Sequence, residues 1–345
     1  MNSVGKGTTT VTTRARDLGI LAVPGTTGPH GAITDVPGVL VGHTTVRRPP
    51  DVHTGVTAIV PRGIGPASPI PAGISVGNGF GKLIGATQVT ELGRLESPIV
   101  LTATLSAFRA ADALVSWLVR EPAFGDVTTF NPVVGECNDG YLSDIRARPV
   151  TEEHVLAAVG GANDGPVAMG SVGAGTGTGA LGFKAGIGSA SRIVEIEGTT
   201  VTLGGLVQAN FGGVLRVLGR PVPPPPHTPR PPDTGSCMLV LATDAPLESR
   251  QLNRLANRAV FGLGRVGASY SHGSGDYGLA FSTGTGTPPP DSALDPLFAA
   301  ALDVVEEMVL DSLLAAATTV GRLGRTLPGL TTSPDWRGLV ADVAR

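Results

Sequence analysis

A Gly235–Ser236 bond joins a proline-rich tract to an apolar run, and this junction limits the folds open to the chain. Eight of the twelve residues in 221–232 are proline, which excludes a helix or a central strand there. Such a tract is extended and semi-rigid, so we interpret 221–235 as a linker. The run that begins at Ser236 reads Ser-Cys-Met-Leu-Val-Leu-Ala-Thr, which is typical of a buried strand. The junction predicts an accessible peptide bond whose C-terminal side is anchored in the core.

The residue types at this junction also allow a reaction within the chain. A hydroxyl that directly follows a glycine can attack the preceding carbonyl. Cleavage there would make Ser236 a new N-terminus that carries a nucleophile and an amine in one residue. The alternative is that Ser236 only ends a loop, because Gly-Ser dipeptides are common and proline tracts usually link elements. The junction alone favours the loop, so the choice depends on other segments.

Composition predicts a densely packed protein with a large core. The 345 residues are 41% hydrophobic but only 15% charged, and they include 50 glycines and 29 prolines. This length fits one large or two ordinary domains. Many glycines favour close layer packing and tight turns, and so few charges favour a buried subunit interface.

Several classes of protein are excluded by the same sequence. A net charge of −3 without a basic tract gives no sign of nucleic-acid binding. Two cysteines and scattered histidines form neither a disulfide framework nor a metal site. The first residues lack the apolar core of a signal peptide, and no apolar run is long enough to span a membrane. We therefore expect a cytoplasmic protein.

Hydrophobic patterns predict helices packed over sheet layers. We expect a flexible start over residues 1–30 and a helical stripe over 105–118. A second helix should open at Asp244-Ala-Pro246, and a long buried helix should run from Asp295-Pro296 to about residue 318. The expected strands are 56–60, 99–105, 238–243, 277–281 and, within 192–211, two or three strands broken at 197–198 and 204–205.

Two glycine patterns formally match a dinucleotide-binding motif: one is Gly177, Gly179 and Gly182, and the other is Gly262, Gly264 and Gly267. Neither pattern is followed by a helix with an acid at the required distance. In so glycine-rich a chain such matches arise by chance. We therefore expect tightly turned backbone at both places and no cofactor.

Three polar segments are candidates for chemistry. Glu136 follows a short apolar run and precedes an Asn-Asp-Gly turn, so it could bind an ammonium group or only stabilise that turn. Asn210 before a glycine pair could donate to an oxyanion or only form a turn. Ser274 and Asp276 lie between small residues and could orient a nucleophile. Nearby His272 suggests a rival serine hydrolase, but the chain has no nucleophile-elbow motif.

Taken together, the segments resemble the autoproteolytic aminopeptidases that include the L-aminopeptidase/D-amidase-esterase and the β-peptidyl aminopeptidases. The resemblance rests on residues 33–45, 133–145, 170–192, 207–213 and 235–283, with Gly-Ser-Cys-Met-Leu-Val-Leu-Ala-Thr-Asp as its most specific part. It implies one domain over 1–345 with a four-layer α/β/β/α sandwich, similar by convergence to N-terminal-nucleophile hydrolases. It also implies cleavage into 1–235 and 236–345, which stay associated and often form a tetramer of such pairs.

The resemblance further implies a role for each candidate residue. Ser236 would be the nucleophile, Ser274 and Asp276 would support it, and Asn210 would serve the oxyanion. Glu136 would hold the free amine of the substrate, and Asn138 stands at a position where some relatives use another residue type. Some relatives have Glu in place of Asp276. The implied activity is release of N-terminal amino acids from small peptides, amides or esters through an acyl-enzyme.

Three alternatives stay open on the sequence. One is an acyltransferase of the ornithine acetyltransferase type, and another is a nylon-oligomer-type amide hydrolase, although both usually use threonine as the nucleophile. The third is an inactive oligomeric scaffold.

Overall fold

Two β-sheets stacked face to face form the centre of the computed structural model, which describes residues 13–226, 235–332, 336 and 338. The first sheet has the order β1-β2-β6-β7-β4, and the second has the order β10-β11-β14-β15-β3-β5. The first comprises β1 Val39–Arg48, β2 Val52–Pro61, β4 Leu83–Ile84, β6 Ile99–Ala103 and β7 Val133–Cys137. The second comprises β3 Ile70–Gly79, β5 Arg94–Leu95, β10 Ile187–Ile196, β11 Thr199–Asn210, β14 Ser236–Thr243 and β15 Gly275–Ser282.

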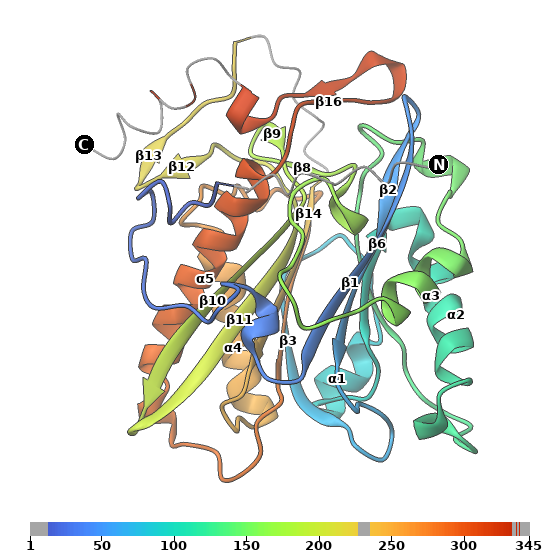
Figure 1. Ribbon diagram of the computed structural model, residues 1–345, viewed down its shortest axis with the longest axis vertical. Helices are drawn as coiled ribbons and strands as arrows, with labels where there is room; N and C mark the ends of the chain where they lie inside the picture. Colours follow the sequence, from blue (N-terminus) through green and yellow to red (C-terminus); the bar gives the residue numbers. More distant parts are fainter. Residues whose placement is uncertain (1–12, 227–234, 333–335, 337, 339–345) are drawn as a thin grey trace, which may run out of the picture.

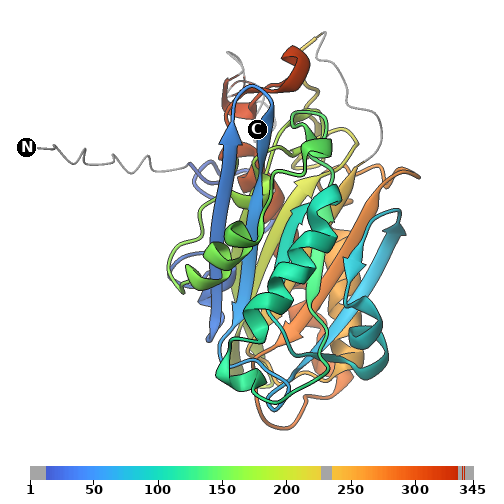
Figure 2. The same cartoon turned by 90° about the vertical axis from the view of Figure 1, so that its right-hand side faces the viewer.

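Helices cover the outer face of each sheet (Figures 1 and 2). The helices are α1 Ala86–Leu92, α2 Ala107–Leu118, α3 Glu152–Gly160, α4 Ser249–Gly262 and α5 Asp295–Leu314. The small ribbons are β8 Gly179–Ala180 with β9 Phe183–Lys184, β12 Arg216–Val217 with β13 Arg220–Pro221, and β16 Thr319–Val320 with β17 Thr326–Leu327. Within the described ranges, no helix combines the length and the apolar character needed to cross a membrane.

Strand β14 shows how the sequence builds these layers. Its side chains alternate between two faces, as the strand period requires. Met238 and Val240 join the core between the two sheets, whereas Leu239 and Leu241 join the core under α4 and α5. A third core lies between the first sheet and helices α2 and α3. The predicted four-layer α/β/β/α sandwich is therefore confirmed.

The two breaks predicted within residues 192–211 have different outcomes. The predicted break at Glu197–Gly198 is the turn between β10 and β11, and both residues have positive φ angles of 48° and 77°. The break predicted at Gly204–Gly205 is wrong, because both glycines lie inside β11. A β-carbon on Gly204 would lie 2.7 Å from Ile33 Cα, and one on Gly205 would lie 2.5 Å from Val304 Cγ1. These glycines allow other layers to approach the strand closely.

The helix limits differ from the prediction where tertiary contacts intervene. Helix α4 begins at Ser249, because the Asp244 carboxylate instead accepts the Thr202 N–H at 2.6 Å. Helix α5 ends at Leu314 rather than near residue 318, and it is buried along most of its length, as its composition predicted. Strand β15 is buried on both faces, since α4 covers one face and the other, with Leu279 and Phe281, joins the core between the two sheets.

The predicted flexible start is wrong for residues 13–30. Ala15 and Ile20 are fully buried, and Arg14 Nε donates to Asp311 Oδ2 on α5 at 2.8 Å. This segment therefore packs across α5. Residues 1–12 and, within the proline-rich linker, residues 227–234 lie outside the described ranges.

Candidate functional site

Strand order brings the candidate residues together at one end of the central strands of the second sheet. Strands β14 and β15 are parallel neighbours, and Ser236 pairs with Gly275 at their first residues. Strand β11 runs antiparallel to β14, so its last residue, Asn210, pairs with Ser236 from the other side. The start of β15 also places Ser274 and Asp276 at this end of the strands. Ser236 is only 3% exposed, so the central serine lies beneath the surface.

The first sheet completes the surroundings of Ser236. The N–H of Asn138, directly after β7, donates to Ser236 Oγ at 3.1 Å. The Cys137 thiol donates to the Ser236 carbonyl at 3.3 Å. The Asn138 side-chain oxygen Oδ1 instead accepts the Gly140 N–H at 2.9 Å. The structure thus brings Asn138 to the serine through its backbone rather than through its amide group.

The peptide bond before Ser236 is held on both sides. The Gly275 N–H donates to the Gly235 carbonyl oxygen at 3.1 Å. A β-carbon on Gly235 would lie 2.9 Å from the Asn210 carbonyl oxygen and 3.3 Å from Ser274 Oγ. A residue larger than glycine at position 235 would therefore crowd the backbone of Asn210.

Ser274 and Asp276 form a buried pair beside this bond. Ser274 Oγ donates to Asp276 Oδ1 at 2.7 Å. Asp276 Oδ2 is buried and accepts no hydrogen bond from the described residues. Burial raises the pKa of the Asp276 carboxyl, and the Ser274 hydroxyl partly offsets this. Asn78 at the end of β3 supports the turn, because its Nδ2 donates to the carbonyls of Ser274 and, at 3.0 Å each, of Ser271 and His272.

Asn210 is oriented by the glycine-rich run. The Gly179 N–H donates to Asn210 Oδ1 at 3.3 Å, so the Nδ2 hydrogens point away from Gly179. The run is held by the buried Lys184, whose Nζ donates to the Gly175 carbonyl at 3.1 Å. Burial lowers the pKa of Lys184 to about 7. The first dinucleotide-like pattern thus forms turned backbone beside the site, whereas Gly262 of the second pattern lies in helix α4.

Glu136 lies near the end of β7 and is 2% exposed. Its Oε1 accepts the Lys82 N–H at 3.0 Å and lies 3.7 Å from Lys82 Nζ. Its Oε2 accepts a hydrogen bond from Thr104 Oγ1. Burial raises the pKa of Glu136, while Thr104 and Lys82 act in the opposite direction.

A close approach of two glycines connects Glu136 with Ser236. A β-carbon on Gly81 would lie 3.2 Å from Gly275 Cα and 3.4 Å from Glu136 Oε1. Gly275 is the partner of Ser236 in the sheet. The backbone of Gly81, which lies beside the carboxylate, therefore packs directly on the sheet partner of the serine.

The rival role of His272 is not supported by its position. Its side chain is exposed and packs against Phe80, with ring centroids 5.9 Å apart. None of the hydrogen bonds found among the described residues joins its ring to Ser236. An imidazole so placed is not positioned as the base for this serine.

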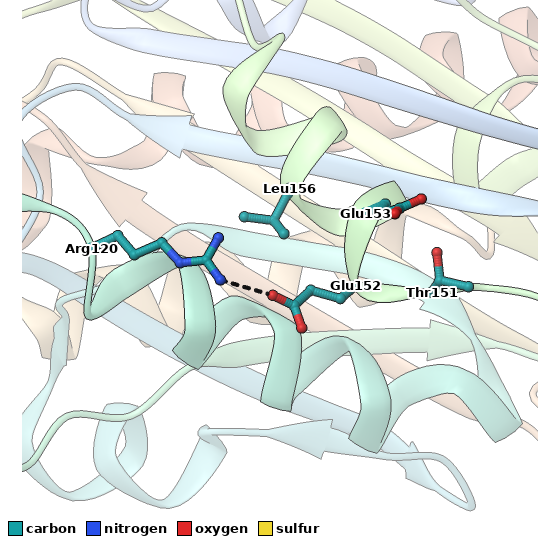
Figure 3. Close-up of a pocket in the computed structure, with 5 residues that line it drawn as sticks. All are labelled: Arg120, Thr151, Glu152, Glu153 and Leu156. Carbon is teal, nitrogen blue, oxygen red and sulfur yellow. Dashed lines mark hydrogen bonds and ion pairs between the residues drawn. The ribbon is translucent and has the colours of Figure 1, made fainter.

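A surface hollow of about 510 Å³ lies over α2 and α3, in the outer layer of the molecule (Figure 3). Arg120, Thr151, Glu152, Glu153 and Leu156 line it. Arg120 pairs with Glu152 at 3.2 Å, and both side chains are exposed. The hollow contains none of the predicted site residues.

Sequence reasoning gave no role to Asn78, Lys82 or Thr104. Asn78 and Lys82 belong to the run Gly77-Asn-Gly-Phe-Gly-Lys82, which directly follows the mostly apolar sequence Ile-Pro-Ala-Gly-Ile-Ser-Val. Polar residues among glycines at the end of a strand are a usable signal for a site. Thr104 carries no such signal, because only the pairing of β6 with β7 brings it to Glu136.

The fold has four layers, and a buried serine, two carboxylates and an amide lie at the strand ends of its two facing sheets. This arrangement is typical of amide-bond hydrolases of the N-terminal-nucleophile type. The model of peptidase family S58 matches residues 31–327. The chain therefore belongs to peptidase family S58 and is a serine-type peptidase.

Known proteins agree with this assignment. The β-peptidyl aminopeptidase BapA of Sphingosinicella microcystinivorans is 39% identical, over 92% of this chain and 89% of that protein. A β-aminopeptidase structure from Burkholderia sp. is 40% identical with a TM-score of 0.86, covering 96% of this chain and 98% of that one. The L-aminopeptidase D-Ala-esterase/amidase of Ochrobactrum anthropi, described as a variant of the Ntn hydrolase fold, is 37% identical with a TM-score of 0.86, covering 96% and 97%. The aminopeptidase and amidase activity expected from the sequence is thus supported.

Proposed function

We propose that this chain cuts itself between Gly235 and Ser236 and then releases N-terminal amino acids from small peptides, amides or esters. The observation that carries the proposal is the position of Ser236, which begins a buried strand with donors on both sides. Its Oγ accepts the Asn138 N–H, and the carbonyl before it accepts the Gly275 N–H. The Gly275 N–H would stabilise the negative charge that develops on the carbonyl oxygen when the hydroxyl attacks, and the Asn138 N–H would hold the hydroxyl in place.

Self-cleavage would proceed through an ester. Ser236 Oγ attacks the Gly235 carbonyl carbon and gives up its proton, and the Gly275 N–H stabilises the resulting oxyanion. The carbon–nitrogen bond breaks, the nitrogen of Ser236 takes up a proton, and Gly235 remains attached to Oγ. Water then hydrolyses this ester, which leaves a carboxylate on Gly235 and a free amine and hydroxyl on Ser236.

Turnover would use the same serine. The new amine has an ordinary pKa of about 7.7–8.0, so near neutrality it can accept the hydroxyl proton without a separate base. The Ser274–Asp276 pair is the other group near enough to take part in this transfer. The serine attacks the first amide of the substrate, Asn210 Nδ2 donates to the oxyanion, and water releases the acyl group.

Glu136 would select substrates with a free amine. A carboxylate buried to this extent binds an ammonium group strongly when a hydrogen-bonded pair forms. Gly81 lies beside this carboxylate and packs on Gly275, the sheet partner of Ser236, so an amine bound by Glu136 would be held near the serine. That placement would restrict cleavage to the first amide of a peptide.

Substitution of Ser236 tests the nucleophile. We expect Ser236→Ala to give one uncut band of 34.8 kDa without peptidase activity. The unmodified protein should give two chains, and N-terminal sequencing of the smaller one should read Ser-Cys-Met-Leu. Normal processing of the alanine variant would contradict the assignment.

A panel of p-nitroanilides tests the requirement for the amine. Free L-, D- and β-amino acid p-nitroanilides should show which class is preferred, and N-acetylation should abolish turnover. Equal cleavage of acetylated and free substrates would show that Glu136 does not bind the substrate amine.

Two further proposals concern location and assembly. We place the protein in the cytoplasm. Because charged residues are few, we also expect the cleaved halves to stay together in a homo-oligomer, such as a tetramer of pairs. Mass measurement of the native particle would test the second proposal.

A further inference from the structure

The carboxylate proposed to bind the substrate amine already has a cation beside it. Lys82 contacts Glu136 Oε1 twice, through its backbone N–H at 3.0 Å and with its Nζ at 3.7 Å. Thr104 Oγ1 bonds the other oxygen. The position at Oε1 that an ammonium group of a substrate would take is therefore shared with an ammonium group of the chain itself.

The two contacts of Lys82 differ in strength. The backbone N–H lies at normal hydrogen-bond distance and is fixed by the fold, whereas 3.7 Å is too long for a hydrogen bond from Nζ. The Lys82 side chain is 42% exposed, while that of Glu136 is 2% exposed. A lysine ammonium on a flexible stem is well hydrated and can move into water at low cost. The cation can thus leave while the backbone contact remains.

We propose that Lys82 is a resident cation that neutralises Glu136 in the empty site and is displaced by the ammonium group of the substrate. This inference rests on the proposed role of Glu136 as the amine-binding group. Exchange of one cation for another keeps the charge of the buried site constant. A substrate with a blocked, uncharged amine cannot displace Lys82 in this way, so Lys82 would increase the selectivity of the site for free amines.

The surroundings of the carboxylate explain why a resident cation is useful. A buried carboxylate without a counter-charge is strongly penalised, and it tends to take up a proton. A protonated Glu136 would bind an ammonium group poorly. Gly81 lies against this carboxylate, because a β-carbon there would lie 3.4 Å from Oε1. Lys82 thus supplies part of the counter-charge of Glu136 in the empty site.

Two substitutions of Lys82 should change substrate affinity in opposite directions. Lys82→Met removes the competing cation and retains the backbone N–H, so KM for a free-amine p-nitroanilide at pH 8 should fall about 1.5- to 5-fold, with the effect confined to KM. Lys82→Arg supplies a guanidinium that can bind the carboxylate with two hydrogen bonds, so KM should rise. Both proteins should still be processed into two chains, which serves as the folding control.

The result that overturns the inference is distinct from failure of the proposed function. An unchanged KM in both variants would show that Lys82 does not compete with the substrate. A higher KM in Lys82→Met, restored in Lys82→Arg, would make Lys82 an orienting residue for Glu136. Failure of the proposed function would appear in the unmodified enzyme, as equal turnover of free and N-acetylated substrate. In a Glu136→Gln background, Lys82→Met should have no further effect on KM.

Discussion

The amide group of Asn210 shows how one backbone contact can define the function of a side chain. The Gly179 N–H occupies Oδ1, and this leaves Nδ2 as the group available to a substrate. Asn210 also lies opposite Ser236 in the sheet, on the strand face directed toward the first sheet. The residue therefore presents a donor beside the proposed nucleophile.

Asn210→Asp tests this donor with little change in shape. The variant keeps an acceptor for the Gly179 N–H but loses the hydrogens of Nδ2. We expect kcat to fall about 10²- to 10³-fold with a much smaller change in KM, as for the loss of an oxyanion donor. Asn163 is a matched control, because its Oδ1 accepts the Gly165 N–H at 3.0 Å on the surface. Asn163→Asp should retain full activity, and retained activity in Asn210→Asp would contradict the proposed role.

At the scale of elements, the β1–β2 hairpin contains a pH-sensitive pair. His43 and Thr57 are direct cross-strand partners, and His43 Nδ1 lies 2.9 Å from Thr57 Oγ1. The His43 Nε2 is buried and has no partner among the described residues. Burial lowers the pKa of His43 from 6.5 to about 4. The folded protein therefore favours the neutral ring.

This shift predicts a loss of stability in acid. The contribution of His43 is fully present above pH 6.5, the unfolded value, and it is lost as the pH falls through about 4. Between pH 7 and pH 4 the loss should be about 2–3 kcal/mol in the free energy of unfolding. Urea unfolding of His43→Gln should show a smaller loss by this amount over the same range. Equal losses in both proteins would show that the ring is not held neutral.

Sequence patterns predicted the elements better than their limits. The apolar period found α2 within two residues, because its buried stripe depends only on local spacing. The start of α4 was misplaced because Asp244 bonds a residue of β11, which is 42 positions away. A local capping signal cannot reveal such a competing partner.

At the scale of the whole molecule, an ionic cluster joins the N-terminal segment to α5. Glu307 is fully buried and accepts hydrogen bonds from Arg16 Nε at 2.6 Å, Arg16 Nη2 at 2.9 Å and Arg192 Nη1. Both arginines precede the proposed cleavage site, and Glu307 follows it. The cluster would therefore hold the two halves together after cleavage, in addition to the shared sheet.

Glu307→Gln should weaken the whole structure. Removal of one charge leaves two guanidinium groups without a full partner, so the free energy of unfolding should fall by about 3–5 kcal/mol. Urea unfolding measures this change. The exposed pair of Arg62 and Asp164, 3.2 Å apart, is the control, and Asp164→Asn should change stability by less than about 0.5 kcal/mol. A Glu307→Gln protein as stable as the control would show that the cluster adds nothing to cohesion.

The sequence by itself determined the junction at Ser236 and the identities of Ser274, Asp276, Asn210 and Glu136 as candidates, because these depend on local residue types. It determined the family and the four-layer architecture through the resemblance of its motifs to known aminopeptidases. Only the tertiary structure decided which groups meet there. Parallel pairing of β14 with β15 directs the Gly275 N–H at the Gly235 carbonyl, and facing of the sheets directs the Asn138 N–H at Ser236. A backbone N–H has no signature in the sequence, because every residue except proline carries one. The packing of the two sheets decides which backbone N–H groups reach the serine.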